Sequence, residues 1–239
     1  INAVRGINSP SVELEYIIKH SNSVGLIVQS KEIWLKLNNK KELKEKLKFI
    51  INLEDEQFES LISWNKFIDA SEKENLQSNI IEKFNPKIDD VATILYTSGT
   101  TGKPKGAMLT EQNLVSNAQE LINLWNINRN DTLIHSLPIY HTHGLFVAIN
   151  TSMISGATIR FIKNFNTDSI IEAFNYSTLM MGVPTFYTRL LNDKRLDKKL
   201  TQNMRLFISG SAPLLNQTFK NFYRVTGHQI LERYGMTET

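Results

Sequence analysis

Short apolar runs that alternate with helical patterns constrain the fold of this chain more than any other feature of its sequence. The runs cover residues 24–28, 49–53, 91–97, 132–137, 158–162, 179–183, 204–209 and 229–231. Most of them are apolar throughout rather than at every second residue, which is typical of strands whose two faces are both covered. We therefore predict eight strands in buried sheets.

The segments between these runs carry apolar stripes at helical spacing. Residues 111–125 hold the clearest stripe, formed by Leu114, Val115, Ala118, Leu121, Ile122 and Trp125. Thr110 precedes this helix, and its hydroxyl can accept a hydrogen bond from a free backbone N–H of the first turn. Shorter stripes at residues 12–19, 168–174 and 215–225 predict further helices. The alternation predicts an α/β fold with parallel-rich sheets flanked by helices.

Two segments of the N-terminal part carry weaker signals. Residues 31–48 contain seven lysines and three glutamates. Such a run is either a basic binding face or, more commonly, the solvated side of a surface helix, and we expect the second. Residues 54–87 are polar and poorly periodic, so we expect a connector there.

Composition excludes several classes of partner and site. The 239 residues carry a net charge of +3, which is too small to indicate a nucleic acid or an anionic membrane as a partner. No run of 18 apolar residues is present, so no membrane span is predicted. The absence of cysteine excludes disulfides, thiolate catalysis and zinc–thiolate sites.

The strongest predicted strand, residues 91–96, leads into Thr-Ser-Gly-Thr-Thr-Gly-Lys-Pro-Lys-Gly at residues 97–106. Glycines bring backbone N–H groups close to an anion, hydroxyls donate to phosphate oxygens, and lysine meets the remaining negative charge. The loop is expected to give way to the helix that starts near Glu111. We therefore predict a phosphate-binding loop, although a segment rich in Ser, Thr and Gly is by itself usually only a turn.

The spacing within this loop differs from the common phosphate loop of GTPases and related ATPases. In that pattern four residues separate the first glycine from a Gly-Lys-Ser/Thr sequence. Here only two residues separate Gly99 from Gly102, and Pro104 follows Lys103.

Three motifs together resemble the adenylate-forming enzymes, which include the acyl-CoA synthetases. Residues 96–106 resemble the signature loop of that superfamily, residues 209–213 its adenine-contacting turn, and residues 232–239 its motif that stacks adenine and reaches the metal. The three occur in the superfamily's order. The resemblance implies that residues 1–239 are part of the large AMP-binding (adenylation) domain, without its N-terminal start and without the C-terminal lid domain.

Enzymes of this superfamily join a carboxylic acid to AMP, release pyrophosphate and usually pass the acyl group to CoA. The resemblance therefore implies ATP, Mg²⁺ and CoA, with small molecules as partners. Because a carboxylate and ATP are both anions, the site has to neutralise charge before they can react. The positions that match the superfamily's phosphate ligands are Thr97, Ser98, Gly99, Thr100, Thr101, Gly102 and Lys105.

The resemblance also implies roles for the metal and for adenine. Thr97 and Glu238 would hold Mg²⁺, since oxygen ligands suit that cation, and with Lys105 they are the implied catalytic residues. Tyr234 would stack on adenine, although an aromatic residue at a strand end can also be a core residue. Gly210, Ser211 and Ala212 would line the other side of adenine, and Thr237 would contact the α-phosphate. The rest of the ATP-binding motif is Glu232, Arg233, Gly235 and Met236.

Two histidines separated by one residue, His141 and His143, lie in the run 137–145. A metal site there is disfavoured because no third His, Asp or Glu is nearby. The resemblance instead places His143 beside the acyl pocket, with Ser211 as a second substrate contact.

Residues 181–190, with the segments 137–150 and 232–239, resemble the malonyl-CoA synthetases within the superfamily. Pro184 begins a helix, and Arg189 lies about one and a half turns into it. In that subgroup the matching arginine pairs with the distal carboxylate of malonate, which a guanidinium fork can bind with two hydrogen bonds. Alternatively, Arg189 is a surface residue near Lys194 and Arg195, and the substrate is a fatty or aromatic acid.

The choice between malonate and methylmalonate as the substrate stays open, because one methyl group changes the free energy of binding by only about 1–3 kcal/mol. An interpretation of another class also stays open, namely a nucleotide-binding fragment or a pseudo-enzyme without turnover. The lysine of the superfamily's lid domain would lie beyond residue 239, so the fragment alone is expected to be inactive. The expected compartment is the cytoplasm, or the mitochondrial matrix in a eukaryote.

Overall fold

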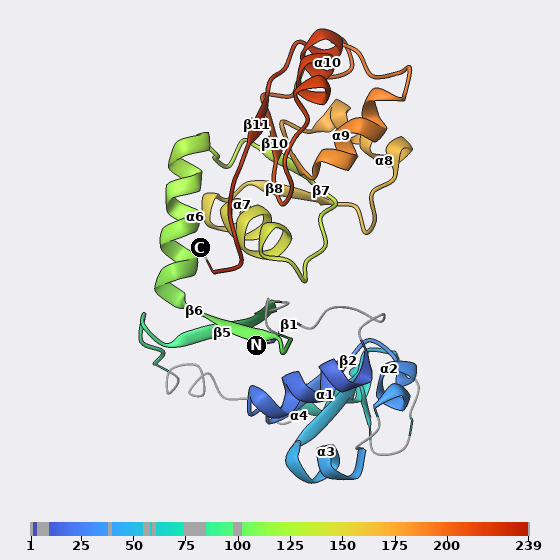
Figure 1. The fold of residues 1–239 in the computed structure, drawn as a ribbon, viewed down its shortest axis with the longest axis vertical. Helices are drawn as coiled ribbons and strands as arrows, with labels where there is room; N and C mark the ends of the chain where they lie inside the picture. The colour runs from blue at the N-terminus through green and yellow to red at the C-terminus, as the bar shows by residue number, and fades with distance from the viewer. Residues whose placement is uncertain are drawn as a thin grey trace. The chain divides into compact units, whose positions relative to one another are not determined.

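The computed structural model describes residues 2–3, 10–37, 40–54, 58, 61–73, 85–97 and 102–238. The chain divides into two compact units, Ile1–Met108 and Leu109–Thr239. Figure 1 shows the helices and strands of both units.

The second unit is built on a sheet of five parallel strands. The strands are β7 (Thr132–His135), β8 (Thr158–Phe161), β9 (Leu179–Gly182), β10 (Leu206–Ser209) and β11 (Ile230–Glu232). Their order across the sheet is β11-β10-β9-β7-β8, and every neighbouring pair is parallel. All five were predicted from apolar runs.

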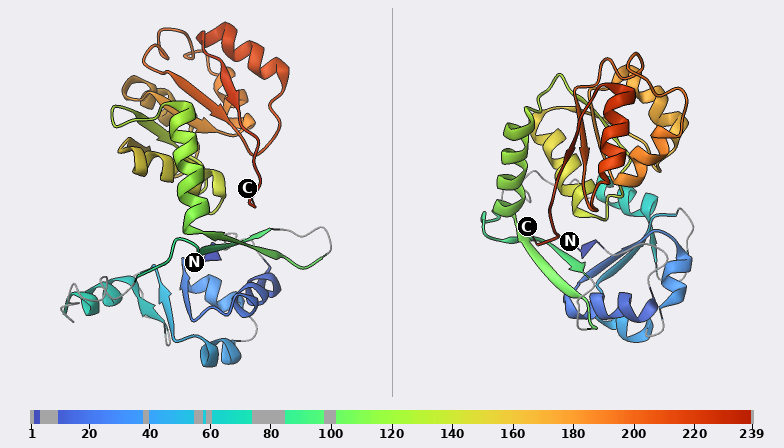
Figure 2. Two further views of the ribbon diagram at one scale, coloured as in Figure 1. Left: turned by 90° about the vertical axis from the view of Figure 1, so that its left-hand side faces the viewer. Right: turned by 45° about the horizontal axis from the view of Figure 1, so that its top comes forward.

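Helices cover both faces of this sheet, as Figures 1 and 2 show. One face packs against α6 (Glu111–Trp125), a π-helical turn η1 (His143–Ile149) and α7 (Asn150–Ser155). The other packs against α8 (Thr167–Ala173), the short 3-10 turn η2 (Phe174–Tyr176), α9 (Pro184–Leu191) and α10 (Asn216–Thr226). Side chains alternate between the faces: Leu179 and Met181 belong to the first core, and Met180 belongs to the second.

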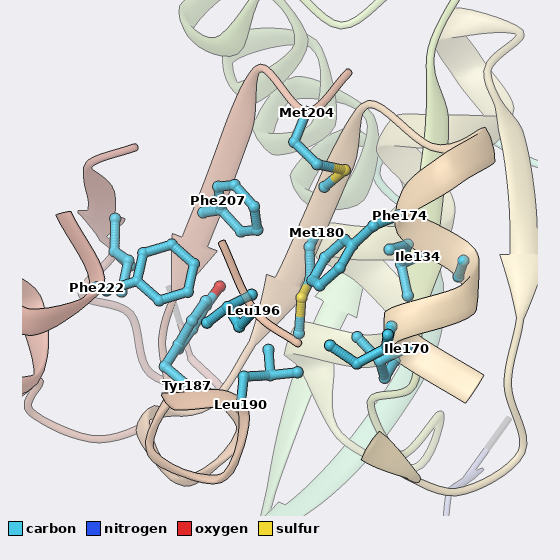
Figure 3. Close-up of a cluster of buried hydrophobic side chains, with 13 residues drawn as sticks. Ile134, Ile170, Phe174, Met180, Tyr187, Leu190, Leu196, Met204, Phe207 and Phe222 are labelled. Atoms are coloured by element: carbon cyan, nitrogen blue, oxygen red, sulfur yellow. The ribbon is translucent and has the colours of Figure 1, made fainter. Parts of the chain in front are cut away.

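The core between the sheet and α8–α10 combines aliphatic side chains with a group of buried aromatic rings. Figure 3 shows Tyr187 and Leu190 of α9 beside Phe207 of β10 and Phe222 of α10. The rings of Phe207 and Phe222 meet edge to face, with centroids 4.9 Å apart. Burial of each such side chain contributes about 1.5–3 kcal/mol to stability. Tyr187 and Leu190 face this core and so fix the rotation of α9 about its own axis. Arg189 therefore lies on the exposed side of α9.

An ion pair between the buried Asp131 and the partly exposed Arg205 ties together the amino edge of the same sheet. Arg205 Nε donates to Asp131 Oδ1 at 2.8 Å, and its other nitrogens donate to the carbonyl oxygens of Trp125 and Asn126 at the end of α6. Thr178 Oγ1 donates to Asp131 at 2.7 Å. Burial alone would raise the pKa of Asp131, but the hydrogen bonds from Arg205 and Thr178 outweigh it and lower that pKa. The opposite, carboxyl edge is therefore the one left for a binding site.

The first unit holds two smaller sheets. Strands β2 (Gly25–Val28), β3 (Phe49–Asn52) and β4 (Ile62–Ser63) are parallel and lie beside α1 (Ser11–His20), α2 (Lys31–Lys36), α3 (Lys40–Lys46) and α4 (Trp64–Lys73). The second sheet has the order β1-β5-β6, with β1 (Asn2–Ala3), β5 (Val91–Thr97) and β6 (Lys105–Thr110). β2, β3 and β5 confirm the remaining three predicted strands.

Several predictions for the first unit need correction. Residues 31–48 form two helices rather than one, with Trp34 and Leu43 buried and most of the lysines exposed, as expected for a solvated side. The connector predicted at residues 54–87 contains β4 and α4. In β5, predicted as buried, only Thr93 and Leu95 are buried.

The segment between the predicted phosphate loop and the following helix is also different from expectation. Strand β6 lies there, so the helix does not follow the loop immediately. The helix itself begins as predicted: Thr110 Oγ1 accepts from Asn113 N–H at 3.2 Å, and Asn113 Oδ1 accepts from Thr110 N–H at 3.0 Å. This reciprocal pair satisfies two backbone donors at the helix start.

Within the described residues, none of the helices combines the length and the apolarity that crossing a membrane requires.

Candidate functional site

The carboxyl edge of the five-stranded sheet gathers most of the predicted site residues of the second unit. Gly210 and Ser211 follow β10, Arg233 and Tyr234 follow β11, and His143 starts the π-helical turn after β7. Parallel strands end at one edge, and in open α/β sheets ligands bind in the crevice outside that edge. Segments far apart in the sequence therefore meet there.

His143 and Ser211 are in direct contact. His143 Nδ1 lies 3.1 Å from Ser211 Oγ. A Cβ atom at Gly210 would lie 2.9 Å from His143 Cε1 and 3.4 Å from the Arg233 carbonyl oxygen, so only glycine allows these segments to approach so closely. Ser211 has a left-handed backbone with φ 68°, a conformation that is uncommon outside glycine and is concentrated at functional sites.

His143 is an uncharged, buried donor or acceptor at neutral pH. Burial lowers its pKa from 6.5 to about 4, and the nearby charges of Arg233 and His135 act in the same direction. Its Nε2 atom is buried and has no hydrogen-bond partner in the described part of the chain. A buried polar atom without a partner is costly, so Nε2 is available for a ligand group.

The motif that follows β11 is anchored at one end and open at the other. Glu232 Oε1 accepts from Leu214 N–H at 2.9 Å, and Arg233 N–H donates to Ser209 O at 2.7 Å. Tyr234 is 85% exposed, which excludes the core-residue alternative and leaves its ring free to stack on a base. The carboxylate of Glu232 holds the turn that precedes α10, and the role of Glu232 in binding ATP stays a prediction.

Arg233 lies close to the backbone of its own motif. A Cβ atom at Gly235 would lie 2.8 Å from Arg233 Nη1, so the glycine lets the guanidinium fold over the chain. Burial lowers the pKa of Arg233, which still remains a cation at neutral pH. Among the described residues no hydrogen bond or ion pair engages its guanidinium. Arg233 thus places a positive charge at the edge of the sheet, and none of the described acidic residues pairs with it.

The first unit carries the flanks of the predicted phosphate loop. Thr97 ends β5 and Lys105 starts β6. Tyr96 Oη lies 2.7 Å from His20 Nδ1, and Lys103 Nζ lies 5.8 Å from the centroid of the Tyr16 ring. Helix α1 therefore contacts both flanks. The predicted phosphate ligands Ser98, Gly99, Thr100 and Thr101 lie outside the described residues.

The predicted magnesium ligands fall in different units, Thr97 in the first and Glu238 in the second. Their sharing of one cation stays a prediction. Over the described ranges, no group of three or more His, Asp or Glu side chains has a metal-binding arrangement. His141 stacks obliquely on Tyr140, with ring centroids 4.6 Å apart.

The family of the chain follows from a comparison with known families. The family described as AMP-binding enzyme matches residues 3–239, which is nearly the whole chain. The chain belongs to this family of AMP-binding enzymes.

Relatives of this AMP-binding enzyme include ligases and a solved structure. The chain is 36% identical over 171 residues to a malonate–CoA ligase of Arabidopsis thaliana and 38% identical over 166 residues to the mitochondrial malonate–CoA ligase ACSF3 of Mus musculus. Each alignment covers 63% of this chain and 28% of the relative. The crystal structure of ATP-bound MatB from Rhodopseudomonas palustris is 39% identical with a TM-score of 0.83, and the match covers 98% of this chain and 44% of that one. The chain thus spans less than half the length of these relatives.

Arg189 of this AMP-binding enzyme is not in hydrogen-bond contact with His143 or Ser211. It is exposed on α9, and its guanidinium carbon lies 4.8 Å from the centroid of the Phe165 ring. Phe165 was missed by the sequence analysis. A signal was present, because Phe165 is an aromatic residue within the polar segment 163–167, directly after a predicted strand.

Proposed function

We propose that this AMP-binding enzyme activates a carboxylic acid with ATP, releasing pyrophosphate and forming an acyl-adenylate, and then transfers the acyl group to CoA. The observation that carries the proposal is the contact of His143 with Ser211 and Gly210 at the carboxyl edge of the sheet, where the exposed Tyr234 follows the neighbouring strand β11. The match of residues 3–239 to the AMP-binding family supports it.

The residues of the second unit fit a nucleotide and an acid. The exposed ring of Tyr234 offers a stacking surface for adenine, and the glycine at position 210 lets His143 pack closely against the turn after β10. Ala212 and Thr237 follow the same strand ends and would complete this binding region. The neutral His143 holds the Ser211 hydroxyl and keeps Nε2 for a substrate oxygen. Arg233 supplies positive charge to a site that receives two anions.

The first unit would supply the phosphate-binding part. We assign Thr97, the loop residues 98–102 and Lys105 to the β- and γ-phosphates, with Thr97 and Glu238 as ligands of Mg²⁺. When bound, Mg²⁺ would neutralise phosphate charge and orient the leaving pyrophosphate. The ammonium group of Lys105 would stabilise the same negative charge as the bond to the α-phosphorus breaks.

Malonate is the proposed acid, with methylmalonate as the closest variant. The similarity to malonate–CoA ligases supports this choice, and so does Arg189, since an apolar acyl pocket would reject a second carboxylate. A fatty or aromatic acid is the alternative. The cytoplasm and the mitochondrial matrix are the proposed compartments, the latter because the mouse relative is named as mitochondrial.

Transfer of an oxygen isotope tests the proposed adenylate. The substrate is malonate labelled with ¹⁸O in its carboxylates, and the enzyme is the product of the complete reading frame that encodes this chain. When the carboxylate attacks the α-phosphorus and CoA later displaces AMP, one carboxylate oxygen stays on AMP. We expect one ¹⁸O atom per AMP by mass spectrometry. Label in inorganic phosphate, with ADP as the other product, would show an acyl-phosphate route and contradict the proposal.

A further inference from the structure

The guanidinium of Arg189 rests on a pair of stacked aromatic rings. Its Cζ atom lies 4.8 Å from the centroid of Phe165, and the Phe165 ring stacks on Phe186 with centroids 4.2 Å apart and 28° between the planes. Phe186 and Arg189 are three residues apart on α9, so both lie on one side of that helix. Phe165 lies in the segment between β8 and α8. Its contact with Phe186 therefore joins this segment to α9.

A cation–π contact of this kind is compatible with an open hydrogen-bonding edge of the guanidinium. A guanidinium that stacks on a ring uses its flat face, while its N–H donors lie in the plane and remain available for a carboxylate. Among the described residues no acceptor takes the donors of Arg189. By contrast, Arg195 is held by Asp193 and Asp168, and Arg205 by Asp131. Arg189 thus contacts an aromatic ring, and no residue that the structure describes neutralises its charge.

The aromatic pair is anchored to the strand ends of the candidate site. A Cβ atom at Gly182 would lie 3.1 Å from Phe186 Cδ2, so the end of β9 packs directly against that ring. The carbonyl oxygen of Gly182 accepts from Gly210 N–H at 3.1 Å. Gly210 in turn borders His143. A continuous set of contacts therefore joins Phe165 to the residues at the carboxyl edge.

We propose that Phe165 is a positioning residue for acid specificity, which with Phe186 holds the Arg189 guanidinium so that its in-plane donors receive the second carboxylate of a dicarboxylic acid. This inference rests on the proposed function. An arginine whose guanidinium is already held on an aromatic ring loses less side-chain entropy on binding a carboxylate than a mobile arginine does. The gain applies to a dicarboxylate and not to a monocarboxylate, which has no group for Arg189 to bind.

The test compares Phe165→Leu with the wild type, in the product of the complete reading frame, for malonate and for propionate. We expect kcat/KM for malonate to fall about 3- to 30-fold, which corresponds to the loss of one cation–π contact. The KM for ATP and kcat/KM for propionate should change less than about twofold. A purely structural defect would lower the use of both acids and weaken ATP binding.

Two control variants separate the ring contact from packing. Phe165→Tyr keeps the ring and should retain malonate use. Tyr176→Leu removes the ring of a second cation–π pair in the same unit, where Arg160 Cζ lies 5.4 Å from the Tyr176 centroid and Arg160 also pairs with Glu172. It should leave both acids unaffected. If Phe165→Leu does not fold, Phe165→Met, which fills similar space without a ring, takes its place.

The outcomes distinguish the inference from the function on which it rests. Malonate use that Phe165→Leu and Phe165→Met leave unchanged would refute the positioning role alone. Equal losses with malonate and propionate would also refute it. A wild-type protein that does not use malonate would refute the proposed substrate and this inference with it.

Discussion

Replacement of Arg189 by alanine is expected to reduce kcat/KM for malonate by about 2–5 kcal/mol in transition-state free energy, roughly 30-fold to several-thousand-fold. The variant leaves the second carboxylate of bound malonate without its partner charge, and an unpaired charge in a binding site costs most of its desolvation energy. The KM for ATP should not change, because Arg189 contacts Phe165 rather than the residues around His143.

Steady-state pyrophosphate release with malonate and with ATP as the varied substrate measures both effects. Arg160→Ala is the matched control, since Arg160 also lies over an aromatic ring in the second unit but is paired with Glu172 at 3.7 Å. Arg189→Lys should give an intermediate loss, because lysine keeps the charge and lacks the planar fork. Malonate turnover that survives in Arg189→Ala would make Arg189 a surface residue, as the alternative interpretation holds.

Acid is expected to destabilise the wild-type protein more than the His143→Gln variant. The unfolded chain protonates this histidine near pH 6.5, whereas the folded protein, in which burial lowers the pKa, does so only near pH 4. Between these values the unfolded state binds more protons, so the free energy of unfolding falls as the pH is lowered from 6.5 to 4. The gap between the two pKa values corresponds to about 3 kcal/mol.

Urea unfolding at pH 7 and pH 4 measures this difference. The wild type should lose about 3 kcal/mol more than His143→Gln, whose amide does not titrate and can still face Ser211. Between pH 7 and pH 8 the two proteins should respond alike, because His143 is neutral there in both the folded and the unfolded state. Equal losses at pH 4, or a His143 pKa near 6.5 in an NMR titration, would contradict the buried, neutral histidine.

The sheet of the second unit could be predicted because each strand is buried on both faces. Leu179, Met180 and Met181 are all at most 1% exposed, so the sequence shows a continuous apolar run rather than alternation. Strand β6 escaped prediction because it starts with Lys105 and Gly106, which read as the end of a glycine-rich loop. Helix α4 escaped because its apolar residues, Trp64, Phe67 and Ile68, stand in an otherwise polar segment that was interpreted as a connector.

The motifs of the candidate site could be predicted from the sequence, but the contacts between their residues could not. The motifs named His143, Ser211 and Arg189 separately, but the contact between His143 and Ser211 depends on where two strands end in one sheet. The support of Arg189 by Phe165 depends on the path of the segment after β8, which no local pattern specifies. The hydrogen bond of the Glu232 carboxylate could not be predicted either, since it comes from a backbone N–H that only the folded turn brings near.

Acid-dependent release of pyrophosphate is the most direct measurement of the proposed activity. The product of the complete reading frame would be given ATP, Mg²⁺ and CoA with malonate, methylmalonate, acetate, octanoate or coumarate. The proposed function and the placement of Arg189 predict release with malonate, weaker or similar release with methylmalonate, and little with the three monocarboxylates. Preference for any of the monocarboxylates would contradict the malonate assignment, and no release with any acid would indicate a nucleotide-binding protein without turnover.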